Sequence, residues 1–502
     1  MAGECAMSRN SLVAGQAGFA FAGLLFGQLM RFGYNLVVAR LLGVEALGIY
    51  ALAIAVMQVA EVVALAGCDA SLLRFVNLYH NDAARQRQVI GFAAKSSLLF
   101  SLAVMALLML FANQLSALFH GNELLTLALS CYAAALPFNV LTQVTAHALQ
   151  AFQHLKPKII ATQLLSPLLL LLFTLLFYYT VGIQAALLMP FLLSACGALL
   201  WILLPFATTT GIRFIDIVRA RHDNAMLTYA LPLMAVSLFS MLSHWLDVMM
   251  LGIFSDAVTV GLYHPAARTA GLLRSVLLAF AGIAAPLFAE LHAQGNKAEM
   301  ARLYKLVTRW SVILLIPPLL IFMVLPQQVL SLFGAHFADS GAVALQLLSA
   351  AYFVQCVFGI ASTLLAMSGY AQLSLINAVV ALALQAGLNW LFIPTMGLQG
   401  AAVASLVLFL LLSALRWLEV RLLLQMNPLS TMLWKPLVAG AVTFLLLMLM
   451  HSWLLMLPSL LALGVGTVIA FSCYVALMLM LKLEVDEKEI IFKYLPFMRK
   501  DG

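Results

Sequence analysis

Six ionisable residues lie inside long apolar stretches of this 502-residue chain. They comprise three arginines, two carboxylic acids and one histidine: Arg31, Arg268, Arg274, Glu61, Asp247 and His244. A charged side chain at the centre of a bilayer costs at least about 2.5–3.5 kcal/mol on insertion scales, so it should face a wet cavity or a charged partner. These positions are therefore the candidates for binding or coupling chemistry, and no catalytic residue is predicted.

The three arginines predict a cavity for an anionic substrate. A guanidinium keeps its charge at physiological pH and forks onto phosphate oxygens. Arg274 is the deepest, about 18 Å into its stretch at a rise of about 1.5 Å per residue, and it is either a cavity cation or half of an ion pair between helices. Arg268 and Arg31 lie nearer a membrane surface, where snorkelling is the alternative. On one continuous helix, Arg268 and Arg274 would point about 120° apart.

The acidic residues and the histidine are candidates for ion coupling or for ion pairs. A carboxyl group in a low-dielectric site can load and release a proton, or it can neutralise an arginine. For Glu61 both interpretations stay open. For Asp247, near the outer end of its stretch, a structural or gating role is preferred to coupling. For His244 a packing role is preferred to coupling.

These residues must be positioned by membrane-spanning helices. The chain is 64% hydrophobic and only 9% charged, which excludes a water-soluble globule. Fourteen apolar stretches are each long enough to cross a hydrocarbon core of about 30 Å as a helix. They run over 12–36, 46–68, 91–113, 124–146, 159–180, 184–206, 226–254, 262–290, 307–325, 341–365, 374–393, 398–420, 436–452 and 459–481. The predicted fold class is an all-α integral membrane protein of about fourteen transmembrane helices.

The placement of charge sets the orientation and argues against a nucleic-acid partner. Most of the 26 basic residues fall between stretches on one side, so the positive-inside rule places both termini in the cytoplasm. The net charge of +7 is thereby explained without nucleic acid. The six scattered cysteines are typical of small core residues.

The sequence lacks the signatures of nucleotide and zinc chemistry. Neither G-x-x-x-x-G-K-[ST] nor H-E-x-x-H occurs, so ATP hydrolysis is not expected and no enzyme activity, cofactor or metal site is predicted. An ion gradient, carried by protons or sodium, the membrane potential and the substrate gradient remain as energy sources.

A weak internal repeat divides the chain into two lobes. Residues 181–186 (V-G-I-Q-A-A) return as 396–401 (M-G-L-Q-G-A), and residues 48–50 (G-I-Y) return as 261–263 (G-L-Y). A repeat of this length holds about six helices, the layout of a two-lobed transporter. The predicted organisation is an N-terminal lobe 1–206, a cytoplasmic linker 207–225, a C-terminal lobe 226–420, an extra helix pair 421–482 and a cytoplasmic tail 483–502.

Three basic, amphipathic segments are predicted to contact membrane lipid. They are the linker 207–225, residues 297–310 and residues 486–500 of the tail. For the last two, a site for a partner is the less favoured alternative. Apolar residues interleaved with lysine and arginine suit a helix that lies on an anionic lipid surface. For the linker, a plain connection between the lobes is an equal alternative.

Three stretches carry a resemblance to a known family. Residues 37–53 (V-V-A-R-L-L-G-V-E-A-L-G-I-Y-A-L-A), 245–268 (beginning W-L-D-V-M-M-L-G-I-F) and 148–158 (A-L-Q-A-F-Q-H-L-K-P-K) resemble the polysaccharide flippases of the multidrug/oligosaccharidyl-lipid/polysaccharide exporter superfamily. The likeness is to the O-antigen-type, Wzx-like branch and covers residues 10–420. By position, Asp247 and Arg268 stand where that family has its common acidic and basic residues.

The resemblance implies a fold and a cargo. The fold would be a V-shaped pair of six-helix lobes that exposes a cationic cavity alternately to each side of a bacterial inner membrane. The cargo would be an undecaprenyl-diphosphate-linked oligosaccharide, moved from the cytoplasmic to the periplasmic leaflet for the biosynthesis of surface polysaccharide such as O-antigen, lipopolysaccharide or exopolysaccharide. A polysaccharide polymerase or assembly complex would be a possible partner.

Three alternatives stay open. Fourteen spans also resemble the MurJ-like lipid II flippases, although the arginine-rich opening of that branch is not evident in the first stretch. A drug or cation antiporter of the same superfamily would share the fold but would favour acidic cavity groups. A non-transporting scaffold would need no cavity charges. One departure is Gln153, where the resembled family more often has glycine in a short turn.

Overall fold

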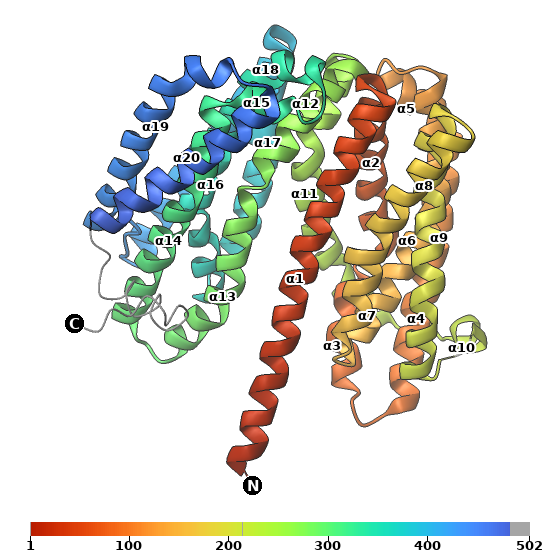
Figure 1. Ribbon diagram of the computed structural model, residues 1–502. Helices are drawn as coiled ribbons and strands as arrows, with labels where there is room; N and C mark the ends of the chain where they lie inside the picture. The colour runs from red at the N-terminus through yellow and green to blue at the C-terminus, as the bar shows by residue number, and fades with distance from the viewer. Residues whose placement is uncertain (1, 213, 482–502) are drawn as a thin grey trace. The chain divides into compact units, whose positions relative to one another are not determined.

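Helices are the regular secondary structure in the part that the computed structural model describes, residues 2–212 and 214–481 (Figure 1). No strand occurs within those residues. Thirteen of the described helical segments are long and apolar enough to cross a membrane. In addition, α1 (Ala2–Leu42) runs without interruption through the first predicted span. The prediction of an all-α, multi-pass membrane protein is confirmed. The predicted basic tail, 483–502, lies outside the described residues.

The helices follow the predicted stretches closely. Their bounds after α1 are α2 Val44–Leu65, α3 Cys68–Leu78, α4 Ala83–Leu110, α5 Ala112–Leu118, α6 Glu123–Ala151, α7 Leu155–Ile159, α8 Ser166–Thr180, α9 Ile183–Thr210, α10 Phe214–Arg219, α11 Asn224–Phe254, α12 Ala257–Gly271, α13 Arg274–Ala293, α14 Lys297–Val324, α15 Pro326–Leu330, α16 Ala335–Met367, α17 Ala371–Met396, α18 Leu398–Leu423, α19 Trp434–Leu455 and α20 Ser459–Met480. A π-helical turn, Ile160–Leu165, joins α7 to α8, and a 3-10 turn, Thr431–Leu433, precedes α19.

Side-chain caps fix where four of the long helices begin. Asp82, Asn122, Asp223 and Asn296 precede α4, α6, α11 and α14, and each accepts a hydrogen bond from the backbone N–H three residues later at 2.9–3.2 Å. Such caps satisfy donors that a helix start leaves unpaired. All four caps follow short polar connections, so the sequence itself marks these helix starts.

The described chain forms two compact units. Unit 1 contains Met1–Arg268 and Leu375–Ser405, and unit 2 contains Thr269–Ser374 and Leu406–Gly502. In unit 1, α6 packs against α2, α4 and α9. In unit 2, α14 packs against α16 and against the C-terminal pair α19 and α20. The lobe boundaries drawn from the internal repeat stay a prediction.

The segment before α11 docks on α4 within unit 1. Lys95 on α4 donates through Nζ to the carbonyl oxygens of Val218 at 2.9 Å and Ala220 at 3.5 Å. Arg85 lies 3.8 Å from the buried carboxylate of Asp223. These contacts hold the end of the predicted linker against a membrane-spanning helix.

A break in the eighth predicted span changes the expected geometry of its two arginines. Helix α12 ends at Gly271 and α13 begins at Arg274, and the residues between them make i→i+3 hydrogen bonds. The predicted angle of about 120° between Arg268 and Arg274 assumed one continuous helix, and that assumption does not hold here. The chain also passes from unit 1 to unit 2 directly after Arg268.

The two glycines of the internal repeat meet in unit 1. A Cβ atom added to Gly48 on α2 would overlap the carbonyl oxygen of Ala257, and one added to Gly261 on α12 would overlap the carbonyl oxygen of Val44. Backbone therefore lies directly on backbone where α2 and α12 cross, a contact that only glycine allows.

We expect Gly48→Ala to destabilise unit 1 by about 1–3 kcal/mol, the usual range for overpacking a tight contact. The methyl group meets backbone, which cannot rotate away. Thermal unfolding of the purified protein in detergent measures the effect.

Gly33→Ala is the matched control. Gly33 lies within α1 and has no atom within 4 Å of the added Cβ, so alanine there should leave stability equal or slightly higher. Equal unfolding temperatures for the two variants would contradict the tight backbone contact between α2 and α12.

Candidate functional site

Arg268 is held by aromatic and histidine side chains of unit 1. Its guanidinium carbon lies 4.3 Å from the centre of the Trp245 ring, a cation–π contact. Its Nη1 lies 3.3 Å from Nε2 of His244. Trp245 is itself fixed by a 2.9 Å hydrogen bond from Nε1 to Oε1 of Gln58. The structure thus brings together Arg268 and His244, two of the predicted site residues, over a rigid aromatic surface.

A buried histidine, His264, completes this cluster. Its ring stacks on Trp245 at a centroid distance of 6.2 Å, and its Nε2 lies 3.0 Å from Oδ1 of Asn35. Because the Asn35 amide donates to the Arg31 carbonyl at 2.7 Å, Oδ1 must accept, which favours the tautomer protonated at Nε2. The 3.4 Å approach of Arg268 Nε to the same nitrogen is then a close contact and not a second strong hydrogen bond.

Arg31 joins the same region from α1. Its side chain is exposed, and Nη2 donates to the Thr162 carbonyl at 3.3 Å. Thr162 lies in the π-helical turn, where the backbone hydrogen bonds run from i to i+5. Such turns within α-helices are frequent at functional sites. The charges of Arg31 and Arg268 both act on the buried Tyr50, so two of the three predicted cavity cations border the same buried tyrosine.

Arg274 belongs to unit 2, at the first position of α13, and its side chain is exposed. Its charge acts on Arg416 of α18, whose other electrostatic neighbour is Glu419. Arg416 therefore lies within electrostatic range of Arg274, and the cavity role of Arg274 stays a prediction.

Asp247 lies among neutral donors of unit 1. Its Oδ1 accepts from Nε2 of Gln385 at 2.8 Å and from Nδ2 of Asn389 at 2.9 Å. Its Oδ2 accepts from the hydroxyl groups of Ser405 at 2.7 Å and Tyr263 at 3.3 Å. The donors come from α12, α17 and α18. Four neutral donors stabilise a carboxylate without any need for a cationic partner.

An unsatisfied oxygen borders this carboxylate. Asn389 is fully buried, and its Oδ1 has no hydrogen-bond partner among the described residues. A buried acceptor without a partner costs about 1–3 kcal/mol. The side chain that donates to Asp247 thus also carries a buried acceptor without a partner.

Glu61 takes part in a second polar cluster of unit 1. Its carboxyl group makes a hydrogen bond with Gln143 and lies within electrostatic range of Asp69. The backbone carbonyl of Gln143 accepts a hydrogen bond from Nδ1 of His147 at 2.8 Å. His147 in turn lies within electrostatic range of Lys158. Lys158 thus joins a mixed-charge group with the carboxyl groups of Glu61 and Asp69. No described group of three or more His, Cys, Asp or Glu side chains is arranged to hold a metal ion.

Comparison with known proteins identifies the family. A family model described as "Polysaccharide biosynthesis protein" matches residues 15–292, more than half of the chain. The chain belongs to this family. The matched region includes Arg31, Asp247, His264 and Arg268. None of the curated proteins compared with this polysaccharide biosynthesis family member matches it.

Solved structures show the fold that this polysaccharide biosynthesis family member shares. It matches the lipid II flippase MurJ, in an inward closed conformation, with a TM-score of 0.72 and 13% identity over 95% of this chain and 99% of that one. It also matches an inward-facing multidrug resistance MATE family transporter of the MOP superfamily, with a TM-score of 0.69 and 19% identity. That match covers 80% of this chain and 94% of the other chain. A third match is a MOP superfamily transporter from Pyrococcus furiosus, which is described as having a binding pocket of reverse polarity. The TM-score is 0.58 and the identity 19%, over 81% of this chain and 95% of the other chain. The predicted superfamily fold is confirmed.

Proposed function

We propose that this protein is a flippase that carries a lipid-diphosphate-linked oligosaccharide from the cytoplasmic to the periplasmic leaflet of a bacterial inner membrane. The polysaccharide biosynthesis family supports a sugar-bearing cargo, and the superfamily fold supports transport. The observation that carries the proposal is the basic cluster of Arg268, Arg31 and His244 in unit 1.

The cluster suits a diphosphate in charge and in geometry. Two guanidinium groups can each fork onto phosphate oxygens, and such charge-assisted bonds are about twice as strong as neutral ones. The Trp245 face and the His244 ring hold Arg268 in place, so little side-chain entropy is lost when it binds. The exposed Arg31 supplies the second cation, and Arg274 is the proposed basic group of unit 2.

Asp247 is the proposed coupling residue. Its side chain accepts four hydrogen bonds, and Asn389, which donates one of them, carries an unsatisfied oxygen. Carboxylate and amide oxygens are the ligands that hard cations prefer. Binding of a cation there would change the packing of α11 against α17 and α18, which supply the surrounding groups. Glu61 is the second acidic candidate, because its carboxyl group is buried, makes a hydrogen bond with the neutral Gln143 and lies near the like charge of Asp69.

The experiment that tests the proposed function measures where the cargo accumulates. A strain without the gene and its complemented parent are labelled with radioactive sugar, and the lipid-linked oligosaccharide in each leaflet is measured. We expect cytoplasmic accumulation and loss of surface polysaccharide in the deletion strain.

The other outcomes separate the alternatives. Accumulation of lipid II instead of another lipid-linked sugar would assign the MurJ-like activity. A normal leaflet distribution would contradict the flippase proposal, and increased drug sensitivity in the same strain would then favour an antiporter.

A further inference from the structure

A buried hydrogen bond joins α12 to α1 within unit 1. It runs between Nε2 of His264 and Oδ1 of Asn35, which are 3.0 Å apart, and the two residues are 1% and 5% exposed. They are 229 positions apart in the chain. Breaking such a bond leaves two buried polar groups without a partner, so the bond fixes how the two helices lie against each other at this level.

The bond lies between the two arginines of the basic cluster. On one side, Asn35 donates through Nδ2 to the backbone carbonyl of Arg31 at 2.7 Å. On the other side, Nε2 of His264 lies 3.4 Å from Nε of Arg268, one turn further along α12. Three contacts of 2.7, 3.0 and 3.4 Å therefore lead from the backbone of Arg31 to the guanidinium group of Arg268.

Aromatic rings hold the imidazole of His264 in one orientation. It stacks on Trp245 with ring centres 6.2 Å apart and an angle of 8° between the planes, and Tyr50 meets it edge-on at 6.3 Å. The guanidinium of Arg268 lies over the same Trp245 ring, which Gln58 fixes by a hydrogen bond. His264 therefore cannot turn away from Asn35 without disturbing the ring that carries Arg268.

Stability alone does not explain this polar pair. The second ring nitrogen of His264, Nδ1, is buried and has no hydrogen-bond partner among the described residues, which lowers stability. Replacing both members of a buried hydrogen-bonded pair by apolar groups of the same shape is nearly neutral or stabilising. What His264 and Asn35 add at this position is a directional bond that an apolar pair lacks.

We propose that His264 and Asn35 are specificity-determining residues, which hold Arg31 and Arg268 so that both bind one diphosphate. The inference rests on the proposed function and adds two residues that act through the arginines. Each guanidinium can fork onto the oxygens of one phosphate group. A diphosphate engages both arginines, whereas a monophosphate engages one. A fixed arrangement of the two arginines therefore favours a lipid diphosphate over the monophosphate of the same lipid.

Two substitutions of His264 separate its hydrogen bond from its other properties. In His264→Gln the amide nitrogen lies the same number of bonds from the backbone as Nε2, so it can still donate to Asn35. In His264→Asn the amide nitrogen corresponds to Nδ1 instead, and the donor no longer reaches Asn35. Both variants carry a neutral amide, so a difference between them reports the hydrogen bond.

The measurement is calorimetric titration of the purified full-length protein in detergent with farnesyl diphosphate and farnesyl monophosphate, which differ by one phosphate group. We expect the parent protein and His264→Gln to bind the diphosphate about 10- to 100-fold more tightly than the monophosphate, the contribution of one further charge-assisted contact. In His264→Asn the ratio should fall to about threefold or less. The monophosphate affinity should stay within about twofold, because one arginine suffices for it.

Asn35→Leu breaks the same hydrogen bond from the other side. It should lower the ratio of the two affinities as far as His264→Asn does. The two substitutions together should lower it no further, because residues that share one interaction are not additive. Thermal unfolding identifies any variant that fails to fold, and a merely structural role would lower both affinities together and leave their ratio unchanged.

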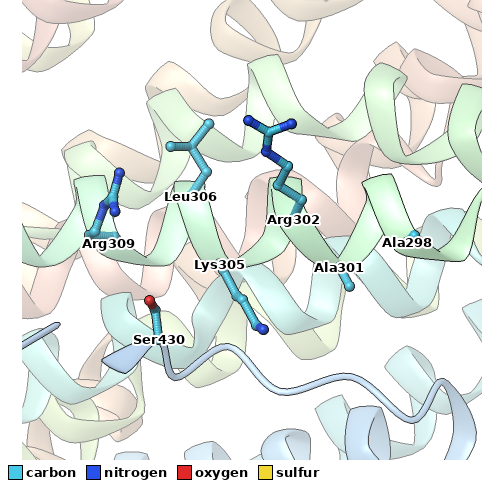
Figure 2. A pocket seen from close by; sticks show the side chains of 7 residues that line it. All are labelled: Ala298, Ala301, Arg302, Lys305, Leu306, Arg309 and Ser430. Carbon is cyan, nitrogen blue, oxygen red and sulfur yellow. The ribbon is translucent and has the colours of Figure 1, made fainter. Parts of the chain in front are cut away.

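Lys305→Gln is the control for general attraction of anions. Lys305 is exposed and lines a basic pocket on α14 of unit 2 (Figure 2), none of whose residues belongs to the cluster around Arg268. Loss of this exposed cation should leave the ratio within about twofold of the parent protein. A fall as large as in His264→Asn would mean that general electrostatic attraction sets the ratio, and it overturns the inference.

The remaining outcomes separate this inference from the proposed function. A parental ratio in His264→Asn, or equal affinity of the parent protein for both probes, overturns the inference and leaves the proposed function in place. Loss of the ratio in His264→Gln as well assigns the effect to the imidazole ring instead of the hydrogen bond, and also overturns it. A parent protein that binds neither probe contradicts the proposed function and the inference together.

Discussion

Arg268→Ala is expected to reduce transport of the lipid-linked oligosaccharide by about 100-fold while the protein still inserts into the membrane. A charge-assisted hydrogen bond contributes about 1.5–3 kcal/mol, and about 1.36 kcal/mol corresponds to a factor of ten in rate. Arg268 also contacts Trp245 and His244, so its loss leaves two preorganised groups without their cation. The measurement is the initial rate of flipping in proteoliposomes that contain purified protein and a fluorescent lipid diphosphate.

Two further substitutions make this experiment specific. Arg268→Lys keeps the charge and should restore part of the rate, because an ammonium lacks the fork and stacks less well on Trp245. Arg40→Ala removes an exposed arginine in the last turn of α1 and should leave the rate within about twofold of the parent, as is usual for surface substitutions. A parental rate in Arg268→Ala would remove this residue from the substrate site and leave Arg31 and Arg274 as the candidates.

The fold was accessible from sequence because hydrophobic length is a strong and local signal. An apolar run that can cross a bilayer must satisfy its backbone internally, and a helix does so within one segment. Local turn chemistry was also informative. Gln153, predicted to occupy a position where the resembled family has glycine, has a φ of 64°, a left-handed conformation that costs most residues about 1–2 kcal/mol. The break between Gly271 and Arg274 was missed because the apolar pattern continues across it.

The candidate site was only partly accessible, since its decisive contacts join residues far apart in the chain. Asp247 and Arg268 were predicted from their charge in an apolar setting. His264 was missed, because one histidine in a helix has no signal that separates packing from function, and its partner Asn35 is 229 residues away. Gln385 and Ser405, which bind Asp247, lie 138 and 158 residues from it. A repeat of short motifs could have suggested that Tyr50 and Tyr263 occupy related places, but it could not have supplied their partners.

Asp247→Asn is expected to abolish ion-coupled transport while leaving the unfolding temperature of the protein nearly unchanged. Asparagine has the same shape as aspartate, and its Oδ1 can still accept from Gln385 and Asn389. The new amide can donate to the Ser405 and Tyr263 hydroxyl groups, which rotate to accept. Only the charge is lost, and without it a sodium ion or a proton has no anionic ligand at this site. Flipping in proteoliposomes with and without an imposed sodium or proton gradient measures the effect.

Asp247→Ala separates the charge of this residue from its structural role. Alanine leaves the donors of Gln385, Asn389 and Ser405 buried without an acceptor, at about 1–3 kcal/mol each, so this variant should unfold at a clearly lower temperature. The matched control for Asp247→Asn is Asp256→Asn. Asp256 lies outside the spans and caps α12 by accepting a hydrogen bond from the backbone N–H of Thr259, and asparagine caps equally well. If Asp247→Asn responds to the gradient like the parent and only Asp247→Ala is impaired, Asp247 is a structural group that joins α11 to α17 and α18. Glu61 would then be the candidate coupling residue, and Glu61→Gln and Glu61→Ala would test it in the same way.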